Sequence, residues 1–382
     1  MNKSGKHTPN ALGFRMPAEW EPHAATWISW PHNADDWPGR FEPIPWIFGE
    51  IVRKLADVER VCILVHNPDI EESARRILIL CGANLAAVEF HLQPTDRIWA
   101  RDFGPLFVRD QAGEVAAVKW RFNGWAKYEN HLLDEAAGHA IASLEGREVW
   151  TPDCVLEGGS IDVNGAGALL TTEECLLSRV QARNPDMTRV QLEAAFHEYL
   201  GVDKVFWLKN GIAGDDTHGH IDDLARFTDA DSVVIVSEPD PSDPNHEPLR
   251  ENLEILRKYP LRVRALPMPA PLIFDGQRLP ASYANFYIAN KTVLVPVFND
   301  PNDRFALNRL AECFPNRQVI GINCVELVWG LGTLHCLTQQ QPRQCCSDLT
   351  QRVALPNMGV EGDVHDLLTG QTTNRLIFLA PF

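Results

Sequence analysis

An α/β fold built from a repeated unit is predicted by the even spacing of the helical segments. Helices are expected to begin near Glu129, Thr188, His246 and Pro301, at separations of 59, 58 and 55 residues. A short β-rich segment follows each helix, and a loop and a pair of strands come next. A repeat of strand, strand, helix and strand is typical of a propeller-like array in which each unit packs against its neighbours. The alternative is a generic α/β protein whose elements happen to be evenly spaced.

The first part of the chain contains elements of the same kind. Helical periodicity runs over residues 46–58 and 70–80, and Glu71 and Glu72 lie in the first turn of the second helix, as the helix dipole prefers. Short apolar strands are expected at 61–65 and 88–92. Residues 1–14 are polar and are expected to form a loose segment.

The strands of the repeat follow in order. Those after the helices are expected at 148–150, 204–208, 261–265 and 318–323, and the strand pairs at 159–163 with 168–172, 220–227 with 232–237 and 284–289 with 292–297. Because no linker rich in Ser, Gly or Pro interrupts this order, we expect residues 1–382 to form a single domain.

Composition and charge exclude several classes of function. The 382 residues are 45% hydrophobic, which is ample for a large core, and 35 basic against 51 acidic residues give a net charge of −16. This charge argues against nucleic acid or an anionic membrane as a partner, since both require a positive surface. It is compatible with a small cationic substrate, although a solvated acidic surface is the commoner reason. A homodimer is also compatible, but the sequence does not define the oligomeric state.

The cysteines and the N-terminus predict a cytoplasmic location. The nine cysteines have no regular spacing, and Cys345 and Cys346 are adjacent, so a disulfide framework is not expected. No secretory signal and no apolar run long enough to cross a bilayer are visible.

Five polar stretches at equivalent places in successive units contain the candidate site residues. They are Asp96–Pro105 with Trp99 and Asp102, Leu156–Asp162 with Glu157, Gly214–Asp223 with Asp216, His220 and Asp222, Ser282–Tyr287 with Asn285, and Trp329–Gln341 with Cys336. We expect these stretches to meet in one pocket. Some have simpler structural explanations: Asp102 could pair with Arg101 or Arg97 in a turn, and Asn285 could make a core hydrogen bond.

Cys336 is the candidate nucleophile. It follows a turn broken by Gly330 and Gly332, and a short strand is expected to start there. Glycines allow the backbone to come close to a ligand. The alternative is that Cys336 is one more small buried hydrophobic residue.

The stretch Gly214–Asp223 is the densest cluster of ionisable groups in the chain. In a strand that begins near Gly219, alternation would place His220 and Asp222 on one face. Burying an acid and an imidazole is costly unless a partner or a ligand uses them. The spacing of His218, His220 and Asp222 also suits a metal site, but Thr217 and Gly219 indicate that His218 lies in a turn, and no CxxC or HExxH pattern is present.

A nucleophilic cysteine with a histidine as general acid and base fits these residues better than a metal does. Carboxylates around a thiol raise its pKa, and they would disfavour an anionic substrate. They suit a planar cation with N–H donors on several sides, namely a guanidinium. A bound guanidinium would also favour the thiolate.

At these residues the chain resembles the agmatine deiminase family, which is related to bacterial peptidyl-arginine deiminase within the guanidine-modifying pentein superfamily. The matching stretches are MPAEWEP (16–22), WARDFGP (99–105), LEGGSIDV (156–163), LLTTEECLL (169–177), GDDTHGHIDDLARF (214–227), DPND (300–303) and LHCLTQQQP (334–342). The resemblance implies a five-bladed α/β propeller of ββαβ units with pseudo-fivefold symmetry. It also implies hydrolysis of agmatine to N-carbamoylputrescine and ammonia through an amidino-cysteine intermediate, without a metal or an organic cofactor.

The resemblance further implies roles for individual residues. Cys336 looks like the nucleophile and His220 like the general acid and base, while Asp102 and Asp222 resemble the carboxylates that hold the guanidinium. The positions that match the pocket of the family, or lie beside it, are Glu157, Asp216, Trp99 and, less securely, Asn285.

The chain departs from the family pattern at two places expected near the pocket. Gly330-Leu-Gly-Thr333 stands where Gly-Gly-Gly-Asn is common, and the early loop Trp30–Trp37 differs from the usual form. An arginine or peptidyl-arginine deiminase on the same scaffold is therefore the enzymatic alternative, with Arg121 as a candidate partner for a substrate carboxylate. A metal-dependent hydrolase and a non-catalytic binder of cationic ligands are the alternatives of other classes.

Overall fold

A computed structural model describes residues 7–344. Its helices are α1 (Ile44–Ala56), α2 (Pro68–Cys81), α3 (Ala100–Phe103), α4 (Leu132–Ser143), α5 (Glu173–Leu177), α6 (Arg189–Leu200), α7 (His246–Leu256), α8 (Asp303–Cys313) and α9 (Leu334–Leu337). Single-residue caps begin several of them: the Asn67 side chain accepts from the backbone N–H of Ile70 at α2, and Thr188 and Gln191 form a reciprocal capping box at α6.

The strands form five larger sheets and one small hairpin. They are β1 (His23–Ser29), β2 (Arg60–Val65), β3 (Val88–Leu92), β4 (Leu106–Arg109), β5 (Val115–Val118), β6 (Val149–Trp150), β7 (Asp162–Val163), β8 (Ala168–Thr172), β9 (Lys204–Leu208), β10 (Ala225–Asp229), β11 (Ser232–Ser237), β12 (Arg262–Pro267), β13 (Ile273–Phe274), β14 (Gln277–Arg278), β15 (Tyr287–Ile288), β16 (Thr292–Val297), β17 (Gln318–Asn323) and β18 (Gln339–Pro342). The sheet orders are β18-β1-β2-β3, β4-β5-β6, β7-β8-β9, β10-β11-β12 and β15-β16-β17, with β13-β14 as the hairpin.

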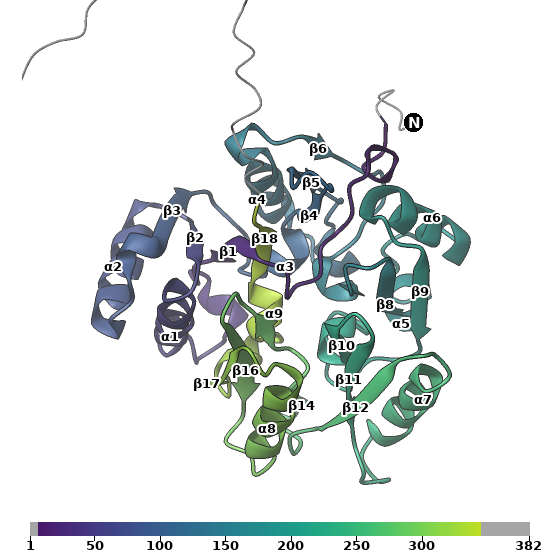
Figure 1. The fold of residues 1–382 in the computed structure, drawn as a ribbon. Coiled ribbons are helices and arrows are strands. Elements are labelled where there is room, and N and C mark those ends of the chain that lie inside the picture. The colour runs from purple at the N-terminus through teal and green to yellow at the C-terminus, as the bar shows by residue number, and fades with distance from the viewer. Residues whose placement is uncertain (1–6, 345–382) are drawn as a thin grey trace, which may run out of the picture. The chain divides into compact units, whose positions relative to one another are not determined.

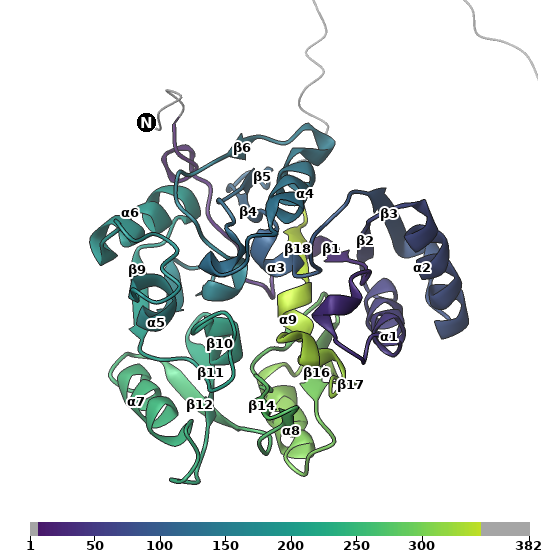
Figure 2. The ribbon, with the colours of Figure 1, turned by 180° about the vertical axis from the view of Figure 1, so that it is seen from behind.

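Each of the five larger sheets repeats one pattern of pairing. The first strand is antiparallel to the second, the second is parallel to the third, and a helix lies between the second and third in sequence. A parallel pair requires such a crossover, which explains the regular placement of the helices. In Figures 1 and 2 the sheets follow one another around the central helices α3 and α9, and the longer helices lie on the outside.

The first sheet joins the two ends of the described chain. Strand β18 pairs antiparallel with β1, so that Trp27 lies opposite Gln339. The Trp27 indole also donates to the Gln341 side chain at 2.9 Å. Figure 1 shows β18 in yellow-green beside β1 in purple. Because α9 directly precedes β18, this pairing fixes the position of the Cys336 segment.

Most predicted elements are confirmed, but three predicted strands begin late. The expected starts at residues 159, 220 and 284 are wrong, since β7, β10 and β15 begin at Asp162, Ala225 and Tyr287. Residues 158–160 and 221–223 are short 3₁₀ turns instead. In the second case the Asp215 carboxylate accepts from the backbone N–H groups of Gly219 and His220, which closes a loop that an extended strand would break.

The expectation of a loose N-terminal segment is wrong for residues 8–14. For residues 1–6, which lie outside the described range, it remains a prediction. A 3₁₀ turn spans Asn10–Leu12, and Phe14 is buried against Trp150 with 5.5 Å between ring centroids. Arg15 then pairs with the backbone of Arg109. The Phe14 ring gives this polar segment an apolar anchor in the core.

Between residues 7 and 344, none of the helices combines the length and the apolar character that a membrane crossing requires. The prediction of one domain over residues 1–382 remains a prediction, because residues 345–382 lie outside the described range.

Candidate active site

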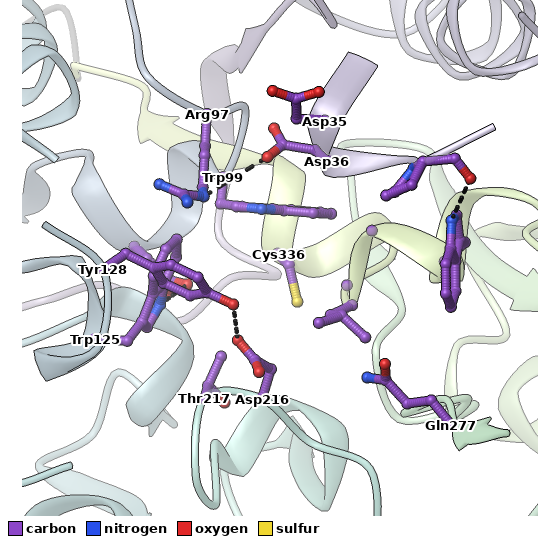
Figure 3. Close-up of a pocket in the computed structure, with 16 residues that line it drawn as sticks. Asp35, Asp36, Arg97, Trp99, Trp125, Tyr128, Asp216, Thr217, Gln277 and Cys336 are labelled. Carbon is purple, nitrogen blue, oxygen red and sulfur yellow. Dashed lines mark hydrogen bonds and ion pairs between the residues drawn. The ribbon is translucent and has the colours of Figure 1, made fainter. Parts of the chain in front are cut away.

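A cavity of ≈ 260 Å³ opens beside the central helices and contains the sulfur of Cys336 (Figure 3). Four of the predicted site residues line it, namely Trp99, Asp102, Asp216 and Cys336. The remaining lining includes Asp36, Arg97, Trp125, Tyr128 and Leu331. Aromatic side chains thus form much of the wall, and carboxylates lie in several places along it.

Cys336 lies on the one-turn helix α9, so the expected strand start is corrected. The strand β18 begins only at Gln339. Asn285 anchors the helix: its Oδ1 accepts from the backbone N–H of His335 at 2.9 Å and from the Thr333 hydroxyl at 2.7 Å. Its Nδ2 lies 3.1 Å from the Cys336 sulfur. Asn285, expected in a strand, therefore lies in the loop before β15 and directs the thiol.

The turn before α9 is held by close packing of the backbone against tryptophans. A Cβ added at Gly330 would meet the Trp37 ring at 2.6 Å, and one added at Gly332 would meet Trp99 at 2.8 Å. Leu331, which lies between the two glycines, has a φ of 69°, a conformation that favours glycine. Leu331 also lines the cavity. Both glycines also line the cavity, so the predicted close approach of backbone to a ligand stays a prediction.

Asp102 lies on the one-turn helix α3 at the inner end of the cavity. Its Oδ1 accepts from the backbone N–H of Gly159 at 3.0 Å, and its Oδ2 accepts from the Trp125 indole at 2.9 Å. The simpler explanation, an ion pair with Arg101 or Arg97, does not hold, because Arg101 pairs with Glu19 and Arg97 lies near Asp36. The carboxylate is held by neutral donors and keeps its charge for another partner.

His220 is enclosed by three carboxylates. Its Nδ1 lies 3.9 Å from Asp102 Oδ1 and 3.8 Å from Asp222 Oδ1, and its Nε2 lies 3.6 Å from Glu157 Oε2. The Cys175 sulfur lies on the same side as Glu157, within 4.8 Å of the ring. Both ring nitrogens, Asp222 Oδ1 and Glu157 Oε2 are buried without a hydrogen bond in the described protein. Unsatisfied buried polar atoms are rare, and here they surround one point.

Gly159 shows how closely these groups converge. A Cβ added there would lie 2.6 Å from His220 Nδ1, 2.9 Å from Asp102 Oδ1 and 3.0 Å from Asp222 Oδ2. Asp222 Oδ2 in turn lies 3.7 Å from the Cys336 sulfur. The four predicted catalytic residues therefore come together around one bare glycine backbone.

The electrostatics of the site set its carboxylates apart. Burial raises the pKa of Asp102 to about 6. Burial acts in the same direction on Glu157, but the Arg183 guanidinium at 3.1 Å and His220 outweigh it and lower the pKa of Glu157 to about 2. Two carboxylates beside the same imidazole thus have different pKa values because only Glu157 also has an arginine partner.

His220 and Cys336 are shifted in the direction that protonates both. Burial opposes the charge on His220, but Asp102 and the contacts to Cys175 and Glu157 raise its pKa well above the usual value. Burial and the carboxylates Asp222 and Asp223 raise the pKa of the Cys336 thiol well above its usual value. Without a bound cation the site holds a thiol and an imidazolium, and a cation among the carboxylates would lower both pKa values.

Two further acidic residues, Asp216 and Asp36, line the outer part of the cavity. Asp216 accepts from the Tyr128 hydroxyl at 2.8 Å and pairs with Lys127. Asp36 lies 3.7 Å from Arg97 Nε, and its Oδ2 is buried without a hydrogen bond. Figure 3 shows Asp36 and Arg97 on one side of the Trp99 ring and Asp216 on the other side of the cavity. Burial raises the pKa of Asp36 to about 6.

A buried charge network behind the site was missed from the sequence. The His335 ring lies between Asp222 Oδ2 at 2.7 Å and Glu19 Oε2 at 2.8 Å. Glu19 also pairs with Arg101 and Arg226. Both residues lay in quoted stretches, Met16–Pro22 and Leu334–Pro342, so their positions carried a signal but their partners did not.

The geometry does not favour the metal alternative that the spacing suggested. His218 has a φ of 62° and lies against Ser178 and Glu174, away from the other two residues. Within residues 7–344, the clusters of three or more potential ligands do not include His218 with His220 and Asp222. Arg121 is exposed and does not line the cavity.

Comparison with known proteins gives consistent matches over most of the chain. The model of the Porphyromonas-type peptidyl-arginine deiminase family matches residues 15–342. The agmatine deiminase of Pseudomonas aeruginosa (strain UCBPP-PA14) is 37% identical over 365 residues, covering 88% of this chain and 97% of the relative.

Solved structures of agmatine deiminases share the fold. The enzyme of Enterococcus faecalis matches with a TM-score of 0.84 and 32% identity, covering 89% of this chain and 99% of that one. The C. jejuni enzyme with substrate bound matches with a TM-score of 0.80 and 31% identity, covering 87% and 97%. The mixed α/β fold is thereby confirmed, and the chain belongs to the Porphyromonas-type peptidyl-arginine deiminase family, among relatives that are agmatine deiminases.

Proposed function

We propose that this protein hydrolyses the guanidinium of agmatine to N-carbamoylputrescine and ammonia by covalent cysteine catalysis. The observation that carries the proposal is the set of buried carboxylate oxygens without hydrogen bonds, Asp222 Oδ1 and Glu157 Oε2, beside His220 and near the Cys336 sulfur. Burying such oxygens is costly. A guanidinium has N–H donors on several sides and would satisfy Asp222 Oδ1, while Glu157 Oε2 faces His220 Nε2. The sequence similarity between this chain and the agmatine deiminases supports the same reaction.

In the first half of the proposed reaction, the guanidinium binds between Asp102 and Asp222. Its charge lowers the pKa of the Cys336 thiol, which gives its proton to solvent, and the thiolate sulfur then forms a C–S bond to the central carbon. His220 donates a proton to one amino group as the C–N bond breaks. Ammonia leaves, and an amidino group remains on the sulfur.

In the second half, water takes the place of ammonia. His220 accepts a proton from the water as its oxygen attacks the amidino carbon, and the carboxylates hold the positive charge of the intermediate. The C–S bond then breaks, the thiol is restored and the carbamoyl product leaves. Glu157, held by Arg183, keeps the His220 ring oriented throughout.

Agmatine also carries a distal ammonium, and the outer cavity suits it. Asp36 has a buried oxygen without a hydrogen bond, and Asp216 lies across the cavity. The aromatic side chains Trp99 and Trp125 provide apolar contact for the methylene groups between the two charges. We assign Asn285 to the positioning of the thiol and Trp99 to the wall of the cavity.

The second candidate is an arginine or peptidyl-arginine deiminase. Arg97 lines the cavity and offers a guanidinium to a substrate carboxylate. Asp36 lies 3.7 Å from Arg97 Nε and already pairs with its positive charge, which disfavours the binding of a substrate carboxylate there. Agmatine is therefore the favoured substrate.

We also propose that the five larger sheets are the blades of a five-bladed α/β propeller with pseudo-fivefold symmetry. The repeated antiparallel and parallel pairing, with a helical crossover between the parallel strands of each sheet, supports it. A cytoplasmic location and a homodimer accompany the proposal as predictions, and light scattering in solution tests the second.

A colour assay for carbamoyl products tests the function. Agmatine, arginine and a peptide with C-terminal arginine are compared side by side, and agmatine is expected to give the highest kcat/KM. Cys336→Ala should lower turnover by at least about 10⁴-fold, because no other group can replace the thiol as the nucleophile. Cys81→Ala, on α2 outside the cavity, is the matched control and should retain activity. Ammonia release by Cys336→Ala near the level of the unmodified protein would refute covalent catalysis, and tight agmatine binding without any turnover would favour a binding protein.

A further inference from the structure

His335 bridges two buried carboxylates directly behind the nucleophile. Its Nδ1 lies 2.7 Å from Asp222 Oδ2 and its Nε2 lies 2.8 Å from Glu19 Oε2. All three side chains are buried. These are short, charge-assisted contacts, and they join residues that are far apart in the sequence.

Each ring nitrogen of His335 faces one carboxylate oxygen. An ionised carboxylate only accepts hydrogen bonds. The pKa values of Glu19 and Asp222 are both lowered, despite burial, by neighbours that include His335, so both carboxylates are ionised. The His335 ring therefore lies between two charged acceptors.

The far end of the bridge is rigid. Glu19 Oε1 accepts from the backbone N–H of Ile288 at 2.7 Å, and its Oε2 lies 3.0 Å from Arg226 and 3.3 Å from Arg101. Arg226 is in turn paired with Asp162 at 2.8 Å. Glu19 is thus fixed from several sides, and it can hold the His335 ring in one orientation.

The near end determines which oxygen of Asp222 is free. His335 occupies Oδ2, while Oδ1 has no hydrogen bond and lies 3.8 Å from His220 Nδ1. Rotation of the carboxylate would break the contact to His335. We propose that His335 is a positioning residue that holds Asp222 so that Oδ1 faces the guanidinium of the substrate. This inference rests on the proposed function, because it assigns the substrate to that oxygen.

Two substitutions of His335 separate its two contacts. In His335→Asn the side-chain amide takes the place of Nδ1, so it can still donate to Asp222 but no longer reaches Glu19. In His335→Gln the amide takes the place of Nε2, so it can still donate to Glu19 but leaves Asp222 without its donor. Both variants replace the imidazole with a neutral amide, and they are therefore matched controls for each other.

Positioning of Asp222 predicts unequal losses. His335→Gln should lower kcat/KM for agmatine by about 10- to 100-fold through a higher KM, since a buried carboxylate loses its donor. His335→Asn should retain activity within about threefold to tenfold of the unmodified protein. Equal losses in the two variants, or unchanged kcat/KM in His335→Gln, would overturn the proposal.

Alkylation of Cys336 gives a readout that does not depend on agmatine turnover. A haloacetamidine is a planar cation that needs the carboxylates, whereas iodoacetamide is neutral, and intact-protein mass spectrometry gives both rates. The ratio of the cationic to the neutral rate should fall in His335→Gln and be largely kept in His335→Asn. If the unmodified protein fails to hydrolyse agmatine but shows this pattern, the proposed function fails while the role of His335 stands.

Circular dichroism shows whether either His335 variant fails to fold. A milder substitution, Glu19→Gln, tests the same bridge in that case. Glu19→Gln keeps the shape of the bridge and removes one charge from its far end. It should lower the same alkylation ratio by about threefold or more, because His335 then loses the charged acceptor at the far end of the bridge. An unchanged ratio in folded Glu19→Gln would count against the bridge.

Discussion

Gly159 is the residue on which the arrangement of the site most directly depends. Its backbone N–H donates to Asp102, and the space where a side chain would stand is taken up by His220, Asp102 and Asp222. The glycine is needed for close approach and not for an unusual backbone angle, since its φ is not positive. The candidate catalytic groups can converge because this position has no Cβ.

Gly159→Ala should therefore damage catalysis more than folding. A methyl group 2.6 Å from His220 Nδ1 must displace the imidazole or a carboxylate, and a shift of about 1 Å in such a site costs about 100-fold in rate. Steady-state kinetics with agmatine and thermal unfolding are the measurements. The control is Gly82→Ala at the end of α2, where φ is 72° and no atom lies within 4 Å. It should lower the free energy of unfolding by about 1 kcal/mol and leave kcat/KM unchanged. Normal kinetics in Gly159→Ala would contradict the geometry of the site.

The predicted site residues were those that stand in dense polar stretches of the sequence. Asp102, His220, Asp222 and Cys336 all lie in such stretches, and their convergence follows from the repeat. Glu19 and His335 were not assigned, although both lay in quoted motifs, because their contact spans 316 residues of sequence. A long-range partner leaves no local pattern, so the bridge between them could only be found in the folded chain.

Two one-turn helices, α3 and α9, present Asp102 and Cys336 from the centre of the described chain (Figure 1). A helix of four residues has too few internal hydrogen bonds to be stable alone. The side chain of Asn285 supplies part of what α9 lacks, through contacts to Thr333, His335 and the Cys336 sulfur. The position of the thiol therefore depends on one amide from a different segment.

Asn285→Ala should lower both stability and activity. Loss of the side chain leaves the buried Thr333 hydroxyl without its acceptor, which costs about 1–3 kcal/mol. The His335 N–H keeps only its longer bond, at 3.2 Å, to the backbone carbonyl of residue 285. Chemical denaturation and kcat are measured together. Asn252→Ala is the matched control, because Asn252 is equally buried and bonds the backbone of Lys209 and Asn210 outside the cavity. It should lose comparable stability and keep kcat, and a parallel loss of kcat in both variants would exclude a specific role for Asn285.

The sequence predicted elements more reliably than their first residues. The strands at 204–208 and 318–323 and the helix capped by Thr188 are confirmed as predicted. The strands expected from 159 and 220 begin several residues later, because Gly158–Ser160 and Ile221–Asp223 turn to bring Gly159 and Asp222 to the site. At Ile221–Asp223 the sequence pattern of polar and apolar residues does not separate a turn from a strand, and the turn depends on hydrogen bonds from the backbone of Gly219 and His220 to Asp215.

The whole chain is acidic, with a net charge of −16, and several of its carboxylates are buried around the cavity. A raised pKa in the folded state means that a carboxyl group contributes stability below its unfolded pKa of about 4, and that this stability is lost as the pH rises through the folded value. For Asp102 the folded value is about 6. At neutral pH the empty site therefore destabilises the protein, and a bound cation should offset this cost.

Agmatine should stabilise the Cys336→Ala variant more at pH 7.5 than at pH 5. At a concentration of 100 times Kd, binding adds about 2.7 kcal/mol to the free energy of unfolding. At pH 5 most of the Asp102 in the free protein holds a proton that the guanidinium must displace, which weakens binding about tenfold and leaves roughly half of that stabilisation. Glu157, with a pKa of about 2, stays ionised at both pH values and does not contribute. Thermal unfolding at matched agmatine concentrations measures the difference. Asp102→Asn in the same background should reduce the pH dependence, leaving the part due to Asp36, whose pKa is also about 6. An undiminished pH dependence in that double variant would show that Asp102 is not the group that titrates against the substrate.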